Sequence, residues 1–308
     1  MRVDVCIATY RRPRGLLRLL GGLQTQEFPE REAPEVRVVV VDNDPERSAR
    51  AVCEEARVWL RFPLVYLTEK RRGIPQVRNT AVAAALGQSD FLAFVDDDEV
   101  PDAGWLAELL RVQRVRGADA VAGPCLPLFE DEVPGWIVRG RFFEHPRHLT
   151  GQRIDYAFTH NVLVRTAALA EMRGLFDERL ALAGGSDHEL FRRFADTGRR
   201  IVWADQAIVN DWIPASRARL GWLLRREFRV GCSLTWAERW RRPRLRSDLW
   251  LCANAGWCLA KGVALLGLSV LRGRVAAVRA LRLVCSGAGR LYALAGRSYE
   301  EYRTLHGA

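Results

Sequence analysis

The alternation of short apolar runs with segments of helical periodicity, over roughly the first 95 residues, constrains the fold of this chain most. Residues 3–8 and 36–41 are rich in β-branched side chains and end in polar turns, as buried parallel strands do. Leucines at helical spacing separate them: Leu16, Leu17, Leu19, Leu20 and Leu23. The alternation continues with a helix over 46–59, a strand over 64–67, a helix over 75–86 and a strand over 91–95. The pattern predicts a doubly wound α/β fold with a mostly parallel sheet, whose ligands bind at the carboxyl ends of the strands.

The alternation continues more loosely up to about residue 215. It predicts a helix over 102–117, a loop-rich stretch over 126–150 and a helix that continues through residue 194, with short strands at 120–123, 161–164 and 200–204. From about residue 220 the strand signals stop. We therefore predict a ligand-binding domain over residues 1–215 and a mainly helical region over 216–308.

The net positive charge of the chain comes from the second of these regions. Residues 215–308 carry 18 basic and 5 acidic side chains, a balance of +13, whereas residues 1–214 carry 29 and 32, a balance of −3. Basic residues beside an apolar helix are attracted to anionic lipid by about 1 kcal/mol each. A basic protein that binds nucleic acid or membranes without catalysis is one alternative, although nucleic-acid readers interleave such charge with recognition motifs that are not found here.

Residues 249–271 form a mostly apolar run of 23 residues, long enough to span a bilayer. On one continued helix, however, polar residues would form a narrow stripe: Asn254, Lys261, Arg272 and Arg279. A lysine in mid-span costs roughly 2.5 to 3.5 kcal/mol, which favours a helix lying in the membrane interface over one that crosses the membrane. A helix packed on the rest of the protein has equal weight.

The composition points to a globular protein in a reducing compartment. The chain has 308 residues, 49% of them hydrophobic and 27% charged, which suits one large or two ordinary domains and excludes disorder. Its 7 cysteines are scattered without a C-x-x-C pair, so neither a disulfide framework nor a zinc site is indicated. The N-terminus lacks the unbroken apolar stretch of a secretory signal. We expect a cytoplasmic protein with possible peripheral contact at the inner face of the cell membrane.

An acidic cluster, Asp96-Asp97-Asp98-Glu99, directly follows the predicted strand 91–95 and therefore lies at the ligand-binding edge. Adjacent carboxylates repel one another, and a divalent cation relieves that repulsion. Side chains at i and i+2 of an extended turn share a side, so Asp96 and Asp98 are expected to face a metal-diphosphate while Asp97 faces away. The alternative is a solvated acidic turn.

A second candidate segment is Gly184-Gly185-Ser186-Asp187-His188-Glu189, which opens a predicted helix. Ser186 or Asp187 would satisfy the free amides as an N-cap. Alternatively, a carboxylate at this place would accept the proton of an attacking hydroxyl.

Together these segments resemble the family 2 glycosyltransferases, inverting enzymes with the nucleotide-sugar-binding A-type fold. The resemblance covers roughly residues 1–235 and rests on motifs in order: 6–12, 38–43, 73–79, 94–99, 185–190, 211–214 and 222–231. It implies that the first three hold the nucleotide, through Ala8, Thr9, Arg11, Asp42, Asn43, Gly73, Arg78 and Asn79. The family usually has a second acid at the position of Asn43, and a Glu at the position of Ser186.

The resemblance also implies roles for the acids. Asp96 and Asp97 would lie near the nucleotide, Asp98 would ligate Mn²⁺ or Mg²⁺ together with Asp96, and Asp211 would complete the metal site. By position, Asp187 would be the catalytic base. The segment Thr159-His160-Asn161 is a further candidate for contact with the sugar or the acceptor, although an ordinary loop histidine is the more typical role for His160. Trp136 and Phe143 are candidates for stacking on a sugar ring, and a place in the buried core is equally typical of them.

The function so implied is metal-dependent inverting transfer of a sugar, with UDP-sugar as the expected donor. The expected acceptor is a hydroxyl of a saccharide or lipid-linked saccharide in bacterial surface polysaccharide synthesis. Transfer to a polyprenyl phosphate itself is the alternative within the same enzyme class. No nucleic-acid partner is expected.

Overall fold

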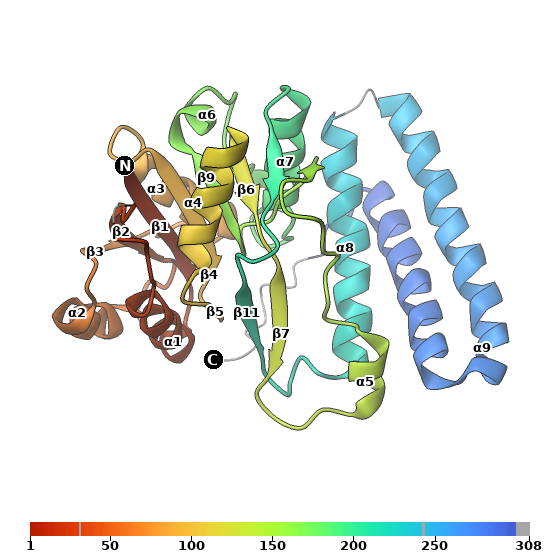
Figure 1. Ribbon diagram of the computed structural model, residues 1–308. Helices are drawn as coiled ribbons and strands as arrows, with labels where there is room; N and C mark the ends of the chain where they lie inside the picture. The colour runs from red at the N-terminus through yellow and green to blue at the C-terminus, as the bar shows by residue number, and fades with distance from the viewer. Residues whose placement is uncertain (31, 242–243, 300–308) are drawn as a thin grey trace.

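A central sheet of eight strands organises the computed structural model, which describes residues 1–30, 32–241 and 244–299 (Figure 1). The strand order is β3-β2-β1-β4-β9-β6-β10-β8. The bounds are β1 Arg2–Thr9, β2 Glu35–Asp42, β3 Leu64–Thr68, β4 Phe91–Asp96, β6 Ala120–Ala122, β8 Arg153–Ile154, β9 Val162–Arg165 and β10 Ile201–Trp203. β1, β2, β3 and β4 are parallel neighbours, whereas β9 runs antiparallel between β4 and β6. The predicted mostly parallel α/β sheet is confirmed.

Helices cover both faces of this sheet (Figure 1). Their bounds are α1 Pro13–Gln24, α2 Arg50–Trp59, α3 Ile74–Ala85, α4 Trp105–Arg116, α5 Gly135–Gly140, α6 Thr166–Ala170, α7 Ser186–Asp196, α8 Leu220–Arg241 and α9 Arg244–Leu294, with a 3₁₀ turn at Glu178–Leu180. Successive side chains of a strand point to opposite faces. Accordingly, Val5 and Ile7 pack in a core with α1 and α4, while Cys6 packs in a second core with α3 and α7.

A smaller sheet of three strands, in the order β5-β11-β7, was not predicted. Its strands are β5 Glu99–Pro101, β7 Cys125–Phe129 and β11 Val209–Ile213. Except for Cys125, β7 falls within the stretch 126–150 that the sequence indicated as loop-rich. These strands are short and pair with partners distant in sequence, so no local pattern marks them. The sheet starts directly after the acidic turn and therefore extends the ligand-binding edge.

The C-terminal region is helical, as predicted, with residues 300–308 outside the described range. α9 reverses at Gly273, whose backbone φ of 78° and ψ of −176° lie outside helical values. A Cβ at Gly262 would lie 2.7 Å from Val284, and one at Gly287 would lie 2.8 Å from Leu259, so the two halves run antiparallel in contact (Figure 1). The predicted polar stripe is therefore wrong, because Arg279 lies on the returning half.

By length and composition, Asp248–Leu294 is apolar enough to cross a membrane, and 17% of its most apolar window is buried. The half of α9 that precedes Gly273 exposes large apolar side chains: Leu249, Trp250, Trp257, Val263, Leu268, Val270 and Leu271. We call this set the outer apolar face. All seven cysteines are free, as the sequence predicted.

Candidate active site

One cavity of about 840 Å³ lies at the carboxyl ends of β1 and β4, between the sheet and α8. Its volume is within the range of ligand-binding pockets. Ten of the thirteen predicted site residues line it: Ala8, Thr9, Asn43, Gly73, Arg78, Asp96, Asp97, Asp98, Asp187 and Asp211. The fold thus brings the acidic turn and the Asp187 segment to one cavity, although about 90 residues separate them in sequence.

Two arginines hold the acidic turn. Arg12, directly before α1, donates to both Asp97 (2.9 Å) and Asp98 (2.8 Å), and Arg217 donates to Asp98 (2.7 Å). Thr9 Oγ1 donates to Asp97 at 2.8 Å. All three aspartates line the cavity, so Asp97 does not turn away from it as expected. Burial raises the pKa of Asp97 to about 6, whereas Arg12 and Arg217 outweigh burial at Asp98 and hold its pKa below the usual value.

The small sheet delivers a further acid to this turn. β11 pairs antiparallel with β5 so that Asp211 lies opposite Glu99. Burial and the negative charges of Asp98 and Asp96 raise the pKa of Asp211 to about 7, although Arg217 opposes the shift. Burial likewise raises the pKa of Glu99, which accepts a hydrogen bond from the Cys125 thiol at 3.2 Å. Negative charge is therefore in excess around Asp211.

Such an excess is what a bound cation would relieve. Within the described ranges, no group of three or more His, Cys, Asp or Glu side chains is arranged to hold a metal ion. Mg²⁺ and Mn²⁺ in nucleotide enzymes usually take only one or two carboxylates and complete their shell with substrate phosphates and water. Asp98, with Asp96 or Asp211 beside it, fits that simpler donor set.

Asn43 organises the loop that approaches the cavity from β3. Its side-chain amide donates to the carbonyls of Glu69 (2.8 Å) and Arg71 (2.9 Å), and its Oδ1 accepts from the amide of Gly73 (2.9 Å). A carboxylate cannot donate to two carbonyls. Gly73 has a φ of +151°, and a Cβ there would lie 2.0 Å from the Gln76 side chain. Where the family that the sequence resembles usually has an acid, Asn43 provides a group that fixes this loop.

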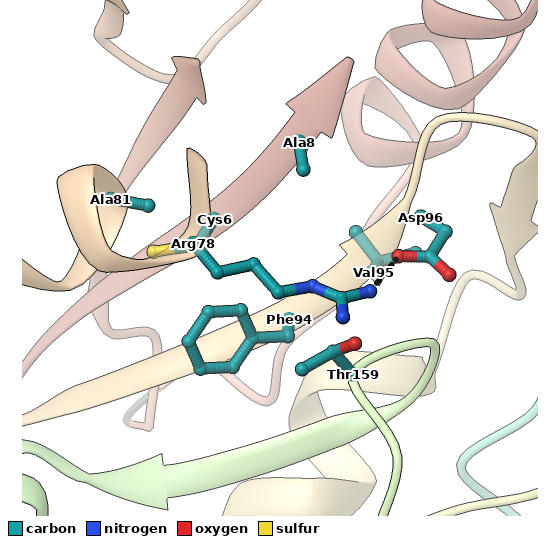
Figure 2. A pocket seen from close by; sticks show the side chains of 8 residues that line it. All are labelled: Cys6, Ala8, Arg78, Ala81, Phe94, Val95, Asp96 and Thr159. Carbon is teal, nitrogen blue, oxygen red and sulfur yellow. Dashed lines mark hydrogen bonds and ion pairs between the residues drawn. The ribbon is translucent and has the colours of Figure 1, made fainter. Parts of the chain in front are cut away.

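Arg78 projects from α3 into the floor of the cavity. Figure 2 shows its guanidinium beside Asp96, with Thr159 facing both. The Arg78 Nη2 to Asp96 Oδ1 distance is 3.1 Å, and Arg78 is 8% exposed. A buried guanidinium at the strand ends is positioned to balance part of the charge of the acids.

Three of the predicted nucleotide-binding residues lie outside the cavity lining. Arg11 pairs with Asp44 and Glu46. Asp42 is buried and accepts hydrogen bonds from the amide of Ala49 and the hydroxyl of Tyr66. The helix that follows, α2, begins at Arg50 and not at residue 46 as predicted. Asn79 exchanges two hydrogen bonds with the backbone of Phe176. Their contacts in the structure fix loops, and a direct contact with nucleotide stays a prediction for them.

Asp187 lies in the first turn of α7, directly after a loop that contacts α8. Gly185 has a φ of +87°, and a Cβ there would lie 3.0 Å from the Cβ of Ser233 on α8. Ser233 Oγ also donates to the carbonyl of Ala183 at 3.0 Å. Gly185, which has no side chain, is the N-cap residue of α7, but Asp187 Oδ1 accepts the amide of His188 in the first turn at 2.8 Å. Asp187 therefore satisfies one of the free amides, as the alternative interpretation predicted.

The carboxylate of Asp187 is kept ionised. Burial acts to raise its pKa, but the positive charge of Arg78 and the hydrogen bond from His188 outweigh burial and hold the pKa below the usual value. Thr159 Oγ1 lies 3.4 Å from Asp187 Oδ2. Asp187 thus presents an unprotonated carboxylate to the cavity.

Comparison with known proteins identifies the family. The family model described as glycosyl transferase family 2 matches residues 4–173, more than half of the chain. The chain belongs to this glycosyltransferase family. The succinoglycan biosynthesis protein ExoM of Rhizobium meliloti is 35% identical over 231 residues, which cover 75% of this chain and 73% of ExoM. The chain is therefore a glycosyltransferase, and its similarity to ExoM supports glycosyl transfer in polysaccharide synthesis.

Solved structures confirm the A-type glycosyltransferase fold. A mannosyltransferase from Pyrobaculum calidifontis, in complex with GDP-Man and Mn²⁺, matches with a TM-score of 0.66 at 18% identity, covering 96% of this chain and 88% of that one. S. aureus TarS 1-349 matches with a TM-score of 0.55 at 20% identity, over 97% and 93% of the two chains. The likeness shows that the glycosyltransferase fold extends over nearly the whole chain.

A cluster of aromatic rings, those of His145, Phe158 and His160, lines part of the glycosyltransferase cavity. His160 lies between His145 and Phe158, with ring centroids 5.5 Å and 5.3 Å away. Burial lowers the pKa of His160, and it lowers that of His145 to about 3 with help from His160, Arg226 and Arg282. Both shifts favour the neutral imidazole, which can exchange hydrogen bonds with hydroxyl groups.

The remaining aromatic candidates lie in a core. Trp136 and Phe143 are buried together with Trp222 and Val278, although Phe143 also lines the cavity.

Asn161, which follows His160, is buried. Its side chain accepts from Trp105 Nε1 at 2.8 Å and donates to the carbonyls of Pro124 and Ala207, so it joins structural elements.

Sequence analysis missed several charged residues that line the glycosyltransferase cavity. Arg12 belongs to the motif 6–12, so its motif was a usable signal. Arg217 lies in a turn between β11 and α8, where no periodicity marks it. Arg226, Arg229 and Arg282 come from α8 and α9, and the motif 222–231 contained the first two without indicating a role.

Proposed function

We propose that the enzyme transfers a sugar from a nucleotide sugar, with UDP-sugar as the expected donor, to a hydroxyl of a saccharide or lipid-linked saccharide, with inversion. One observation carries this proposal: the acidic turn Asp96–Asp98 and the ionised Asp187 line the same cavity. A transferase needs a place for a metal-bound diphosphate and a base for the incoming hydroxyl, and the cavity offers both.

In this proposal the strand side of the cavity binds the donor. The loop fixed by Asn43, together with Thr9 and Gly73, surrounds the nucleoside, while Arg12, Arg78 and Arg217 are close enough to the acidic turn to contact phosphate oxygens. Asp98 would hold a Mn²⁺ or Mg²⁺ ion with Asp96 or Asp211. When bound, that ion neutralises charge on the departing diphosphate.

Asp187 acts as the general base in this proposal. It accepts the proton of the acceptor hydroxyl, whose oxygen forms a bond to the anomeric carbon as the bond from that carbon to the diphosphate breaks. A single displacement of this kind inverts the configuration. A base with a lowered pKa remains unprotonated at neutral pH, as this step requires.

Names of similar proteins support parts of the proposal. Structures of TarS contain UDP or UDP-GlcNAc, and the Pyrobaculum mannosyltransferase contains GDP-Man with Mn²⁺. The glucosyl-dolichyl phosphate glucuronosyltransferase of Haloferax volcanii is 25% identical over 252 residues, and its name indicates a lipid-linked sugar acceptor. That name favours a lipid-linked saccharide over a bare polyprenyl phosphate as acceptor.

Thermal unfolding with a panel of nucleoside diphosphates and nucleotide sugars, with and without Mn²⁺, tests the donor. A ligand at a hundredfold excess over its Kd stabilises the folded state by about 2.7 kcal/mol, which is readily detected. We expect a Mn²⁺-dependent rise in Tm with UDP or one UDP-sugar. A shift with GDP compounds alone would mean that the donor carries guanine and not uracil as its nucleobase. The absence of any shift would contradict the proposal.

We also propose peripheral contact of the outer apolar face with an anionic membrane, because this face is unusually apolar and the surrounding region is basic. Replacing Trp257 by Glu, on the outer apolar face, is expected to weaken binding to anionic vesicles in a flotation assay at least tenfold. Val58→Glu, which adds the same charge at an exposed position on α2, is the matched control. Equal binding of the two variants and the unsubstituted protein would contradict the membrane contact.

A further inference from the structure

Three side chains with aromatic rings form a row on one wall of the cavity. They are Tyr156, Phe158 and His160, and the residues that alternate with them, 157, 159 and 161, are each 1% exposed. The ring centroids of Tyr156 and Phe158 lie 5.6 Å apart, and those of Phe158 and His160 lie 5.3 Å apart. We call these three side chains the ring row. The nucleotide and the metal proposed for the strand ends give the ring row no role.

The segment that carries the ring row is anchored on its buried side. The hydrogen bonds of Asn161 hold one end of the segment, and Ala157 packs in the same core as α3 and α7. At the other end, the hydroxyl of Tyr156 shares a hydrogen bond of 2.7 Å with His148 Nε2, and the His148 ring centroid lies 5.2 Å from that of Trp203 on β10. Rings that are already fixed in this way lose little conformational freedom when a ligand binds to them.

The ring row begins beside the proposed base. The ring centroid of Phe158 lies 6.0 Å from that of His188, the residue after Asp187. Burial lowers the pKa of His160, and the charges of Asp96 and Asp187 oppose that shift, so His160 lies near both acids. The far end of the row is joined to β10, next to the β8 edge of the central sheet. The ring row therefore leads from the reacting groups toward that edge.

The chemistry of the ring row suits a sugar better than a hydrocarbon chain. A pyranose ring presents C–H groups that pack on aromatic rings, and hydroxyls that exchange hydrogen bonds with neutral imidazoles such as those of His160 and His145. A hydrocarbon chain would displace water from His160 without replacing its hydrogen bonds, which is costly. The distance between neighbouring rings is comparable to the length of one pyranose unit, so successive rings can contact successive units.

We propose that the ring row binds the acceptor as an oligosaccharide of at least two pyranose units. The unit with the attacking hydroxyl lies on His160 and Phe158, where Asp187 accepts its proton, and the next unit lies on Tyr156. This inference rests on the proposed function and narrows its saccharide acceptor to chains of two or more units.

Saturation-transfer NMR on the full chain tests the inference. The probes are the methyl glycosides of glucose and galactose and of the β-linked disaccharides built from them. The variants are Tyr156→Leu and Phe158→Leu. Phe62→Leu is the matched control, because Phe62 is half-buried like them and lies outside the cavity lining. Thermal unfolding without ligand shows that each variant is folded, and the nucleotide screen, run on each variant, reports on the donor site separately.

We expect the second sugar unit to lower the Kd about fivefold in the unsubstituted protein and in Phe62→Leu. Tyr156→Leu should lose this gain while binding the monosaccharides as before, and Phe158→Leu should bind both sizes about fivefold more weakly. Equal Kd values for the two sizes in the unsubstituted protein, an unchanged gain in Tyr156→Leu, or no binding of any probe would overturn the inference. No nucleotide enters these titrations, so a failed nucleotide screen beside an intact gain would refute the donor proposal and not this one.

Discussion

Replacing Asp187 by Asn is expected to lower the rate of sugar transfer by about 10²–10⁴-fold, the usual contribution of a general base. The substitution keeps the shape of the side chain and an oxygen that can accept the His188 amide, but removes the group that takes the proton. Donor binding should persist. The measurements are initial rates with the donor found by the unfolding screen, and the Kd of its nucleoside diphosphate.

Asp196→Asn is the matched control for this variant, because it removes the same charge from an exposed residue at the other end of α7. It should transfer sugar at the normal rate. The lowered pKa of Asp187 adds a pH test: the unprotonated base persists as pH falls, so the rate should decline only below the usual titration range of an aspartate. A variant Asp187→Asn with undiminished transfer would exclude Asp187 as the base.

Replacing Asp98 by Ala is expected to remove the effect of Mn²⁺ on nucleotide binding. In the unsubstituted protein, Mn²⁺ should account for most of the stabilisation of about 2.7 kcal/mol at a hundredfold excess of nucleotide. In the variant, Arg12 and Arg217 lose a carboxylate partner but remain available for the proposed contacts with phosphate. The nucleoside diphosphate should therefore bind with one affinity whether or not Mn²⁺ is present. Tm shifts and calorimetric titrations measure both quantities.

Asp131→Ala is the control for loss of one negative charge, because Asp131 is exposed and lies outside the cavity lining. Its Mn²⁺-dependent shift should equal that of the unsubstituted protein. Should Asp98→Ala retain the full Mn²⁺ effect, the ion would have to bind through other residues, and Asp98 would not be a ligand.

The strand side of the cavity was accessible from sequence because its residues follow strands that are apolar without interruption. Asp96–Asp98 come directly after β4, and the topology of such sheets places strand ends together. The position of Asp211 was not accessible in the same way. It depends on a register between β11 and β5 that joins residues more than 100 positions apart, and neither strand is long enough to show a period.

The side of the cavity that α8 and α9 line could not be predicted for a different reason. Hydropathy along residues 249–271 indicates an apolar helix but not the direction of the chain after it, which depends on one glycine at a positive φ. Because α9 turns back at Gly273, Arg282 reaches the cavity on the returning half. Periodicity projected along a single straight helix placed that half wrongly.

The contact between Gly185 and Ser233 couples the part of the cavity that α8 lines to the loop that precedes Asp187. The helix that presents Arg226 and Arg229 to the cavity also supports the loop of Asp187. An exchange of C-terminal regions between relatives would therefore replace the side chains that α8 contributes to the cavity and disturb the position of Asp187 in the same step. Divergence of such enzymes toward new substrates should proceed by paired changes in α8 and in the 183–187 loop, and chimeras joined near residue 215 should need the loop of the same parent to be active.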